Sequence, residues 1–343
     1  MSEETLHTTT VEFTATDGRA LNLLHVEGPR PATRPPVILV HGAGVRANIF
    51  RAPVQRTIVD VLIERGHDVW LENWRASIDV EPSNWDLDQA AVHDHPAAVR
   101  TVVEQTGASS VNAVIHCQGS TSFAMAAVAG LVPEVRTIVS NAVSLHPVVP
   151  GFSRFKANTM LPLVARLTDH LDPSWGLHAP GLLAKSIAGF VRMTHHECDN
   201  LVCRLVSFTY GAGFPALWRH ENLNDETHAW LSNEFAFVPM SFFDHIAKGV
   251  SEGSLVNTGR YDQLPRNFTA QPPKTDARFV LFAGERNRCF LSESQERTFE
   301  FLDRHQPGHH AVHVIPDYGH LDVFMGRNAA KDVFPLMADA LEA

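Results

Sequence analysis

The chain has 343 residues, 44% of them hydrophobic, which is enough for one large domain or for a core with an inserted cap. Its formal net charge is −10 and it has no basic run, which argues against nucleic acid as a partner. Four cysteines do not make a disulfide scaffold in a chain of this size, so we expect reduced thiols and a cytoplasmic location. We expect no membrane-spanning segment, because no apolar stretch approaches the roughly 18 to 20 residues that span a bilayer. The acidic start Met1–Glu4 lacks the apolar region of a signal peptide.

The first predicted elements are a β-hairpin and a buried strand. Val11–Thr14 and Leu21–Val26 read as strands joined by a turn at Asp17-Gly18, a pair that favours hairpins. Val37–Val40 has the length and aliphatic content of a buried strand, and it ends in His41-Gly42-Ala43-Gly44. A glycine-rich turn after such a strand lets backbone N–H groups face a ligand.

Helices and strands alternate over the next stretch. Helical spacing of apolar residues predicts a helix over Thr57–Arg65, and a strand over Asp68–Leu71 follows it. Asp86 is the predicted N-cap of the next helix, which runs to about Gln105.

One short stretch joins a strand directly to a helix. Val111–Ile115 reads as a buried strand, and the Ala- and Met-rich segment Ser120–Leu131 reads as a helix. A strand that turns sharply into a helix lifts one side chain above the sheet edge and aims the free N–H groups of the helix at whatever that side chain attacks. Here that side chain is Cys117, and Gly119 permits the close approach of strand and helix. The alternative is that Cys117 is simply a small core residue.

After the predicted strand Val135–Val143, the alternation stops at about Leu145 and resumes only at Arg278. The residues between are rich in Phe and Met, in helical stretches separated by Pro and Gly. Such an insertion predicts a cap over an apolar pocket. The alternative is a small satellite core without a ligand.

The insertion also contains a group of histidines and cysteines. Thr194-His195-His196-Glu197-Cys198 is followed by Cys203, so a zinc site has to be considered. The spacing matches no standard zinc finger, however, and it identifies no fourth ligand. We therefore predict no metal, and we expect no cofactor.

The last part of the chain returns to alternating elements. Strands over Phe279–Ala283 and Ala311–Ile315 enclose a helix over Ser292–Arg304, and a closing helix begins near Asn328. This order, with short turns, predicts an α/β protein with a mostly parallel, doubly wound sheet.

Three separated segments resemble α/β-hydrolases, and among these the acid lipases of the lysosomal and gastric type. His116-Cys117-Gln118-Gly119-Ser120 is similar to the nucleophile elbow Gly-x-Ser-x-Gly, and most of all to the His-Ser-Gln-Gly-Thr of acid lipases. Cys117 stands in place of the nucleophilic serine, and Ile115 in place of the first glycine. Tyr318-Gly319-His320-Leu321-Asp322 resembles their Tyr-Asn-His-Leu-Asp, and Gly284-Glu285-Arg286-Asn287 stands where they have Gly-x-x-Asp.

This resemblance implies an α/β-hydrolase fold, with residues 1–145 and 268–343 as the core and residues 146–267 as an inserted helical cap. Cys198 and Cys203 resemble in spacing a cysteine pair of acid lipase caps, although in a reducing cytoplasm they would be free thiols. The sequence leaves open whether Cys117 is natural or a substitution introduced to trap a complex.

By position in the family, Cys117 would be the nucleophile, His320 its base, and Asn287 the group that orients the imidazole ring. The N–H groups of Ala43 and Gln118 would form the oxyanion hole. A free thiol has a pKa of about 8.5, and a neighbouring imidazolium lowers it. A resting thiolate–imidazolium pair, held by a neutral amide carbonyl as in papain-like Cys-His-Asn sites, is therefore chemically coherent.

Two carboxylates are alternatives for the third member of this site. Glu285 lies in the same loop as Asn287, and Asp262 lies in another loop. Either would supply the acid that the Gly-x-x-Asp position lacks.

The function that these residues predict is acyl transfer from a small-molecule substrate with an apolar acyl group. The main hypothesis is a hydrolase of a carboxylic ester, thioester or lactone that forms an acyl-thioenzyme at Cys117. One alternative is an acyltransferase that passes the acyl group to a nucleophile other than water. A second alternative is a non-catalytic protein that binds hydrophobic ligands. The exact substrate and the oligomeric state stay open.

Overall fold

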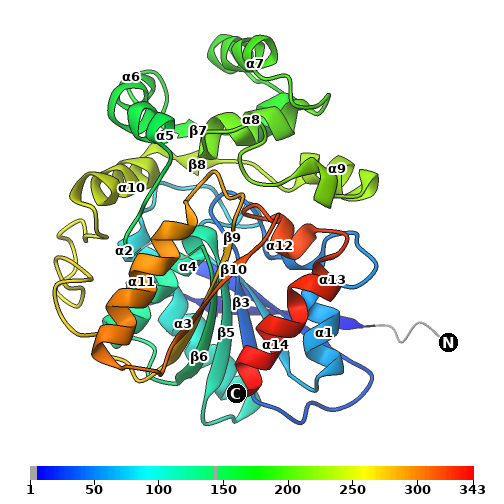
Figure 1. The fold of residues 1–343 in the computed structure, drawn as a ribbon, viewed down its shortest axis with the longest axis vertical. Coiled ribbons are helices and arrows are strands. Elements are labelled where there is room, and N and C mark those ends of the chain that lie inside the picture. The colour runs from blue at the N-terminus through cyan, green and yellow to red at the C-terminus, as the bar shows by residue number, and fades with distance from the viewer. Residues whose placement is uncertain (1–5, 143–144) are drawn as a thin grey trace.

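The structure is a computed structural model that describes residues 6–142 and 145–343. An eight-stranded sheet forms its centre, in the order β1-β2-β4-β3-β5-β6-β9-β10 (Figure 1). β2 is antiparallel to β1 and to β4, and the other neighbouring strands are parallel. The strands are β1 His7–Thr14, β2 Ala20–Glu27, β3 Val37–Val40, β4 Val69–Asn73, β5 Val111–His116, β6 Val135–Asn141, β9 Arg278–Gly284 and β10 Ala311–Ile315. Two predictions, the acidic start Met1–Glu4 and the strand end at Val143, fall outside the described residues.

Helices cover both faces of this sheet. α1 and α14 pack on one face, and α3, α4 and α11 pack on the other (Figure 1). Side chains along β3 alternate between the two cores, as the period of a strand requires. The helices of this part are α1 Ile58–Glu64, α2 Leu87–Gln89, α3 His95–Thr106, α4 Cys117–Val128, α11 Ser292–His305, α12 Asp322–Met325, α13 Ala329–Asp332 and α14 Phe334–Glu342. The predicted mostly parallel, doubly wound sheet is therefore confirmed.

Local sequence sets the helix ends in this part. The Thr57 side chain accepts a hydrogen bond from the N–H of Asp60, whose carboxylate accepts one from the N–H of Thr57. Asp86 forms the same reciprocal cap with Gln89, so the predicted N-cap is confirmed. α3 ends where Gly107 takes a left-handed conformation with a φ of 69°.

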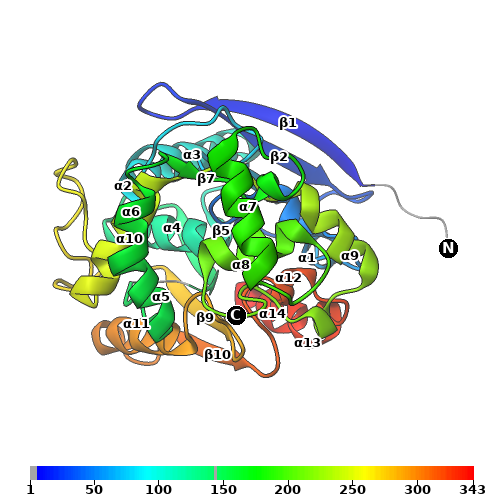
Figure 2. The ribbon, with the colours of Figure 1, turned by 90° about the horizontal axis from the view of Figure 1, so that it is seen from above.

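Residues 145–277, here called the insert, connect β6 to β9 and lie over the carboxyl ends of the parallel strands (Figures 1 and 2). The elements of the insert are α5 Gly151–Phe155, α6 Leu161–Val164, β7 His170–Leu171, α7 Leu182–Thr194, α8 Leu201–Tyr210, α9 Asp225–Trp230, β8 Val238–Pro239 and α10 Met240–Glu252. None of the described helices, in the insert or outside it, is long and apolar enough to cross a membrane.

The helix α4 approaches the end of β3 closely at Gly119. A Cβ atom at this position would lie only 2.1 Å from the carbonyl oxygen of His41. The glycine therefore allows the loop after β3 to lie against the first turn of α4.

We expect Gly119→Ala to lower the free energy of unfolding by about 3 kcal/mol, because the added methyl group meets backbone that can move only by displacing β3 or α4. The matched control is Gly189→Ala in α7, where an added Cβ has no atom within 4 Å. This control should be neutral or stabilising by up to ~1 kcal/mol, the helix propensity difference. Urea titrations measure both values, and equal stability of the two variants would contradict the packing argument.

Candidate active site

Cys117 forms the turn between β5 and α4, and its φ is 55°. A residue with a side chain in this left-handed region is strained by roughly 1 to 3 kcal/mol, so the surrounding structure has to impose the conformation. β5 is paired on both sides, by β3 and by β6, and every residue of α4 is buried. Both arms of the turn are therefore held. The sequence predicted a helix beginning at Ser120, whereas α4 begins at Cys117 itself.

Two backbone N–H groups face the thiol of Cys117. Burial raises the pKa of this thiol to about 12, and hydrogen bonds from the N–H groups of Gln118 and Ala43 oppose part of that increase. Gly42 allows this approach, because a Cβ there would lie 2.8 Å from the Cβ of Cys117. Tyr210, at the end of α8, donates a hydrogen bond of 3.0 Å to the carbonyl oxygen of Ala43. The structure thus brings both predicted oxyanion residues to the candidate nucleophile.

His320 lies in the loop after β10 and is fully buried. Its N–H donates a hydrogen bond to the carbonyl of Leu217, so the insert helps to hold this loop. One imidazole nitrogen of His320, one of His116 and the sulfur of Cys117 lie within 4.8 Å of one another. Nε2 of His320 is buried and has no hydrogen-bond partner among the described residues. The ring is thus within reach of the thiol.

The amide of Asn287 contacts the other nitrogen of the ring, with 3.0 Å between its Nδ2 and Nδ1 of His320. The N–H groups of Cys289 and Phe290 donate to Oδ1 of Asn287 at 2.9 and 3.2 Å. These two donors fix the amide orientation, so the NH₂ group donates to Nδ1. The neutral ring then carries its proton on Nε2. This differs from the expectation that an amide carbonyl orients the ring, because backbone donors already engage that carbonyl.

Burial also decides the charge state of the pair. It lowers the pKa of His320 to about 3 and raises that of Cys117 to about 12. The neighbouring His116, whose ring centroid is 4.8 Å from that of His320, is buried too, and desolvation lowers its pKa well below the usual value. A neutral thiol therefore lies beside a neutral imidazole, in contrast to the expected thiolate–imidazolium pair.

The two alternative carboxylates lie apart from the ring. Glu285 is half-exposed and accepts a hydrogen bond from the N–H of Asp317, and Asp262 is exposed. Within the described residues, the group bonded to Nδ1 of His320 is Asn287.

An apolar pocket of about 900 Å³, including its mouth, opens beside Cys117. Its lining is mostly from the insert and includes Phe208, Phe242, Phe243, Ile246, Val250 and Phe290. Other aromatic and Met side chains of the insert lie on its outer surface instead, and Phe152, Phe214 and Met193 are more than half exposed. The Phe-rich composition thus serves both the pocket and the outer surface.

Two residues near the site were missed by the sequence analysis. Tyr210 lines the pocket and holds the Ala43 loop, and Lys156 lines the pocket while its Nζ donates to the carbonyls of Phe208 and Gly211. Burial lowers the pKa of Lys156 to about 8. Neither residue belongs to a motif, and both reach the site only because the insert folds over the core.

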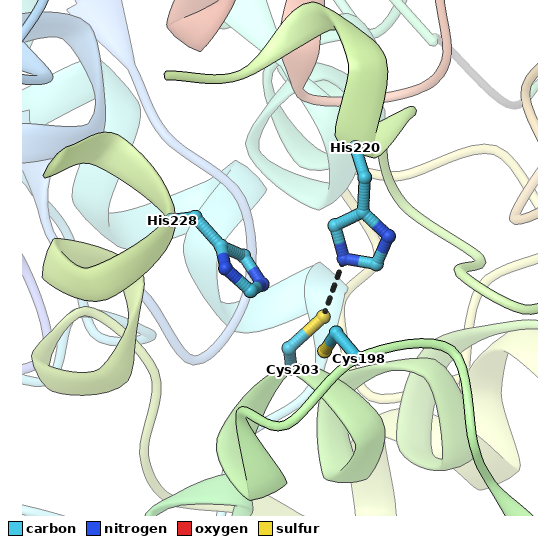
Figure 3. Close-up of side chains that lie close together, drawn as sticks. All are labelled: Cys198, Cys203, His220 and His228. Atoms are coloured by element: carbon cyan, nitrogen blue, oxygen red, sulfur yellow. Dashed lines mark hydrogen bonds between the residues drawn. The ribbon is translucent and has the colours of Figure 1, made fainter. Parts of the chain in front are cut away.

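Two groups of side chains in the described residues have the composition of metal ligands. One is the His116, Cys117 and His320 group already described. The other contains Cys198, Cys203, His220 and His228, and lies in the insert (Figure 3). The histidines that the sequence analysis considered for a zinc site, His195 and His196, belong to neither group.

We expect alkylation of Cys117 by iodoacetamide to be slow at pH 7 and to accelerate about tenfold per pH unit without levelling off below about pH 11, because only the thiolate reacts and burial raises the pKa of this thiol to about 12. Mass spectrometry of the peptide that contains Cys117 measures the rate, and Cys117→Ser provides the blank. Fast labelling that does not change with pH would show instead that the resting pair is thiolate and imidazolium.

Comparison with known proteins places this chain in a family. The model of the alpha/beta hydrolase fold matches residues 35–326. Lipase member K of Homo sapiens is 24% identical over 94% of this chain and 84% of its own length, and triacylglycerol lipase 1 of Arabidopsis thaliana is 23% identical over 95% and 85%. An esterase from Exiguobacterium antarcticum shares the fold, with a TM-score of 0.58 and 11% identity over 98% of this chain and 100% of that chain. The chain therefore belongs to the alpha/beta hydrolase fold family.

Proposed function

We propose that this protein hydrolyses carboxylic esters with an apolar acyl group, through an acyl-thioenzyme at Cys117. The observation that carries the proposal is the strained turn at Cys117, which directs a thiol toward two backbone N–H groups at the mouth of an apolar pocket. Such a strained turn lowers the stability of the folded protein, and a core that needed only a small apolar residue at this position would not require it. The relatives named as lipases support an ester as the substrate class.

In the proposed reaction, the sulfur of Cys117 attacks the ester carbonyl and the alcohol leaves. The N–H groups of Ala43 and Gln118 stabilise the oxyanion, an effect typically worth ~3–4 kcal/mol for each donor. His320 accepts the thiol proton at Nε2 and passes it to the leaving alcohol. Water then hydrolyses the thioester and regenerates the thiol. We further propose that residues 146–267 act as a cap that selects the acyl group.

The resting orientation of Asn287 opposes the first step. Nε2 of His320 can accept the thiol proton only when the ring proton is on Nδ1, and the NH₂ group of Asn287 opposes that tautomer. We propose that the amide turns during turnover and gives up its bonds from Cys289 and Phe290, each worth roughly 1 kcal/mol. We therefore expect a low rate of acylation, because the amide has to turn before the thiol proton can be transferred.

The same orientation supports a second candidate function, a non-catalytic protein that binds hydrophobic ligands. A neutral thiol beside an imidazole with its proton on Nε2 is unreactive, while the apolar pocket is unaffected. The two candidates differ in whether an acyl group becomes covalently attached to Cys117.

We expect kcat/KM for p-nitrophenyl esters to rise about fourfold for each added CH₂ from acetate until the pocket is filled, which corresponds to ~0.8 kcal/mol for each buried CH₂. Cys117→Ala measures the background hydrolysis. Activity that is flat from acetate to octanoate would contradict the proposed acyl pocket. Added alcohol or amine acceptors test the acyltransferase alternative, because a transferase would form the new ester or amide in preference to the free acid.

We expect Asn287→Asp to accelerate acylation at neutral pH by roughly tenfold or more. One carboxylate oxygen can keep the backbone donors while the other accepts from Nδ1–H of His320, so no side chain has to turn. The carboxylate should also raise the pKa of His320, which burial now holds at about 3. Activity of this variant should fall as the pH falls through the raised pKa, whereas the parent should show no such loss until close to pH 3.

Acylation is measured by stopped-flow release of p-nitrophenol and by intact mass. The control is Glu285→Gln, which changes a carboxylate of the same loop that is turned away from the ring. If neither the parent nor Asn287→Asp forms an acyl adduct, the hydrolase proposal fails and the ligand-binding candidate stands.

A further inference from the structure

Four metal-ligating side chains converge in the insert, away from the residues that contact Cys117. Cys198 precedes α8, Cys203 lies in its first turn, His220 follows the loop after α8, and His228 lies in α9 (Figure 3). Their sulfur and nitrogen atoms all lie within 4.8 Å of one another. Two thiols and two imidazoles form the ligand set that selects zinc in a tetrahedral site.

The spacing of these atoms suits a tetrahedral ion. Sγ of Cys203 and Nε2 of His220 are 3.4 Å apart. Zinc bonds of about 2.3 Å to sulfur and about 2.0–2.1 Å to nitrogen separate two such atoms by about 3.6 Å at the tetrahedral angle. Nε2 of His228 is buried and makes no hydrogen bond of good geometry within the described part of the chain. His228 therefore presents a buried nitrogen atom that is available to bind an ion.

The protein around the cluster orients its members independently of an ion. Oδ1 of Asn200 accepts from the N–H groups of Val202 and Cys203 and caps α8. Nδ2 of the same residue donates to the carbonyl of His228 at 3.0 Å and to Ser232 at 2.8 Å. A single side chain thus joins the start of α8, with its cysteine, to the helix that carries the histidine.

The environment also favours thiolates. Both sulfur atoms lie at the N-terminal end of α8, where the helix dipole stabilises negative charge. Neither cysteine is in a disulfide.

We propose that Cys198, Cys203, His220 and His228 bind one structural zinc ion. Each thiol releases its proton to solvent when the ion binds, so two thiolates neutralise the charge of Zn²⁺. Four protein ligands close the tetrahedron and leave no position for a substrate. This proposal departs from the sequence prediction of no metal. The seven residues between His220 and His228 exceed the three to five of a standard finger, so the spacing did not indicate this site.

The position of this cluster gives the ion a structural role. α8 carries Cys203 in its first turn and ends at Tyr210, which donates to the carbonyl of Ala43 in the proposed oxyanion loop. An ion that ties the start of α8 to α9 therefore also steadies the end of α8 over the pocket. This role rests on the proposed function, whereas binding of the ion itself does not.

We expect the untagged full-length protein, purified without chelator, to contain about one zinc ion per chain by plasma mass spectrometry. Cys203→Ser and His228→Gln should lose most of this zinc. The matched controls Cys289→Ser and His196→Gln should keep it, since Cys289 is a buried cysteine and His196 a histidine of the insert outside the cluster. Equal zinc in Cys203→Ser and the parent would overturn the proposal.

Cobalt substitution tests the site without relying on variants that have to fold. The parent, stripped of metal under reducing conditions, should take up one equivalent of Co²⁺ and develop the thiolate charge-transfer and intense visible bands of tetrahedral coordination. A parent with four free thiols that binds neither Co²⁺ nor Zn²⁺ overturns the proposal. So does a zinc-free protein as purified in which thiol counts with and without reductant reveal a Cys198–Cys203 disulfide. Ester hydrolysis is not part of these readouts, so failure of the zinc site and failure of the proposed function are separate outcomes.

Discussion

The left-handed conformation of Cys117 is the constraint on which the rest of the site depends. β5 and α4 can meet at this angle only because Gly42 and Gly119 leave room for the thiol and for the carbonyl of His41. The same contact brings the N–H groups of Ala43 and Gln118 to one sulfur atom. The strain at Cys117, the close backbone approaches at Gly42 and Gly119 and the proposed oxyanion hole therefore belong to one packing arrangement. A change in one of them would alter the others.

Burial sets the charge state of Cys117 and His320, which cannot be read from the residue types alone. A cysteine and a histidine in contact commonly exchange a proton and become an ion pair, but here desolvation stabilises the neutral form of each. The amide of Asn287 acts in the same direction, since its NH₂ group donates to the ring nitrogen that an imidazolium would need as a donor. In the proposed reaction, charge at this site must therefore develop after the substrate binds, where the proposed oxyanion donors can stabilise it.

The insert contributes through contacts that cross between it and the core. Leu217 accepts a hydrogen bond from the backbone of His320, and Tyr210 holds the carbonyl of Ala43. The pocket beside Cys117 is lined mainly by insert residues. The insert has a two-residue ladder as its sheet, so a metal tie between α8 and α9 would add to the hydrogen bonds by which Asn200 already joins these two helices.

The sequence by itself determined the order of strands and helices, the turn at Cys117, and which loops bring Ala43, Asn287 and His320 to the sheet edge. These features depend on local periodicity, on glycines and caps, and on the rule that parallel strands end at one edge. Only the tertiary structure decided the orientation of the Asn287 amide, the neutral state of the thiol and imidazole, and the meeting of Cys198 and Cys203 with His220 and His228. The meeting of the cysteines and histidines depends on residues far apart in the chain, the orientation of the amide on backbone donors that compete for one oxygen, and the neutral state of the thiol and imidazole on the exclusion of water. A sequence pattern records none of these three.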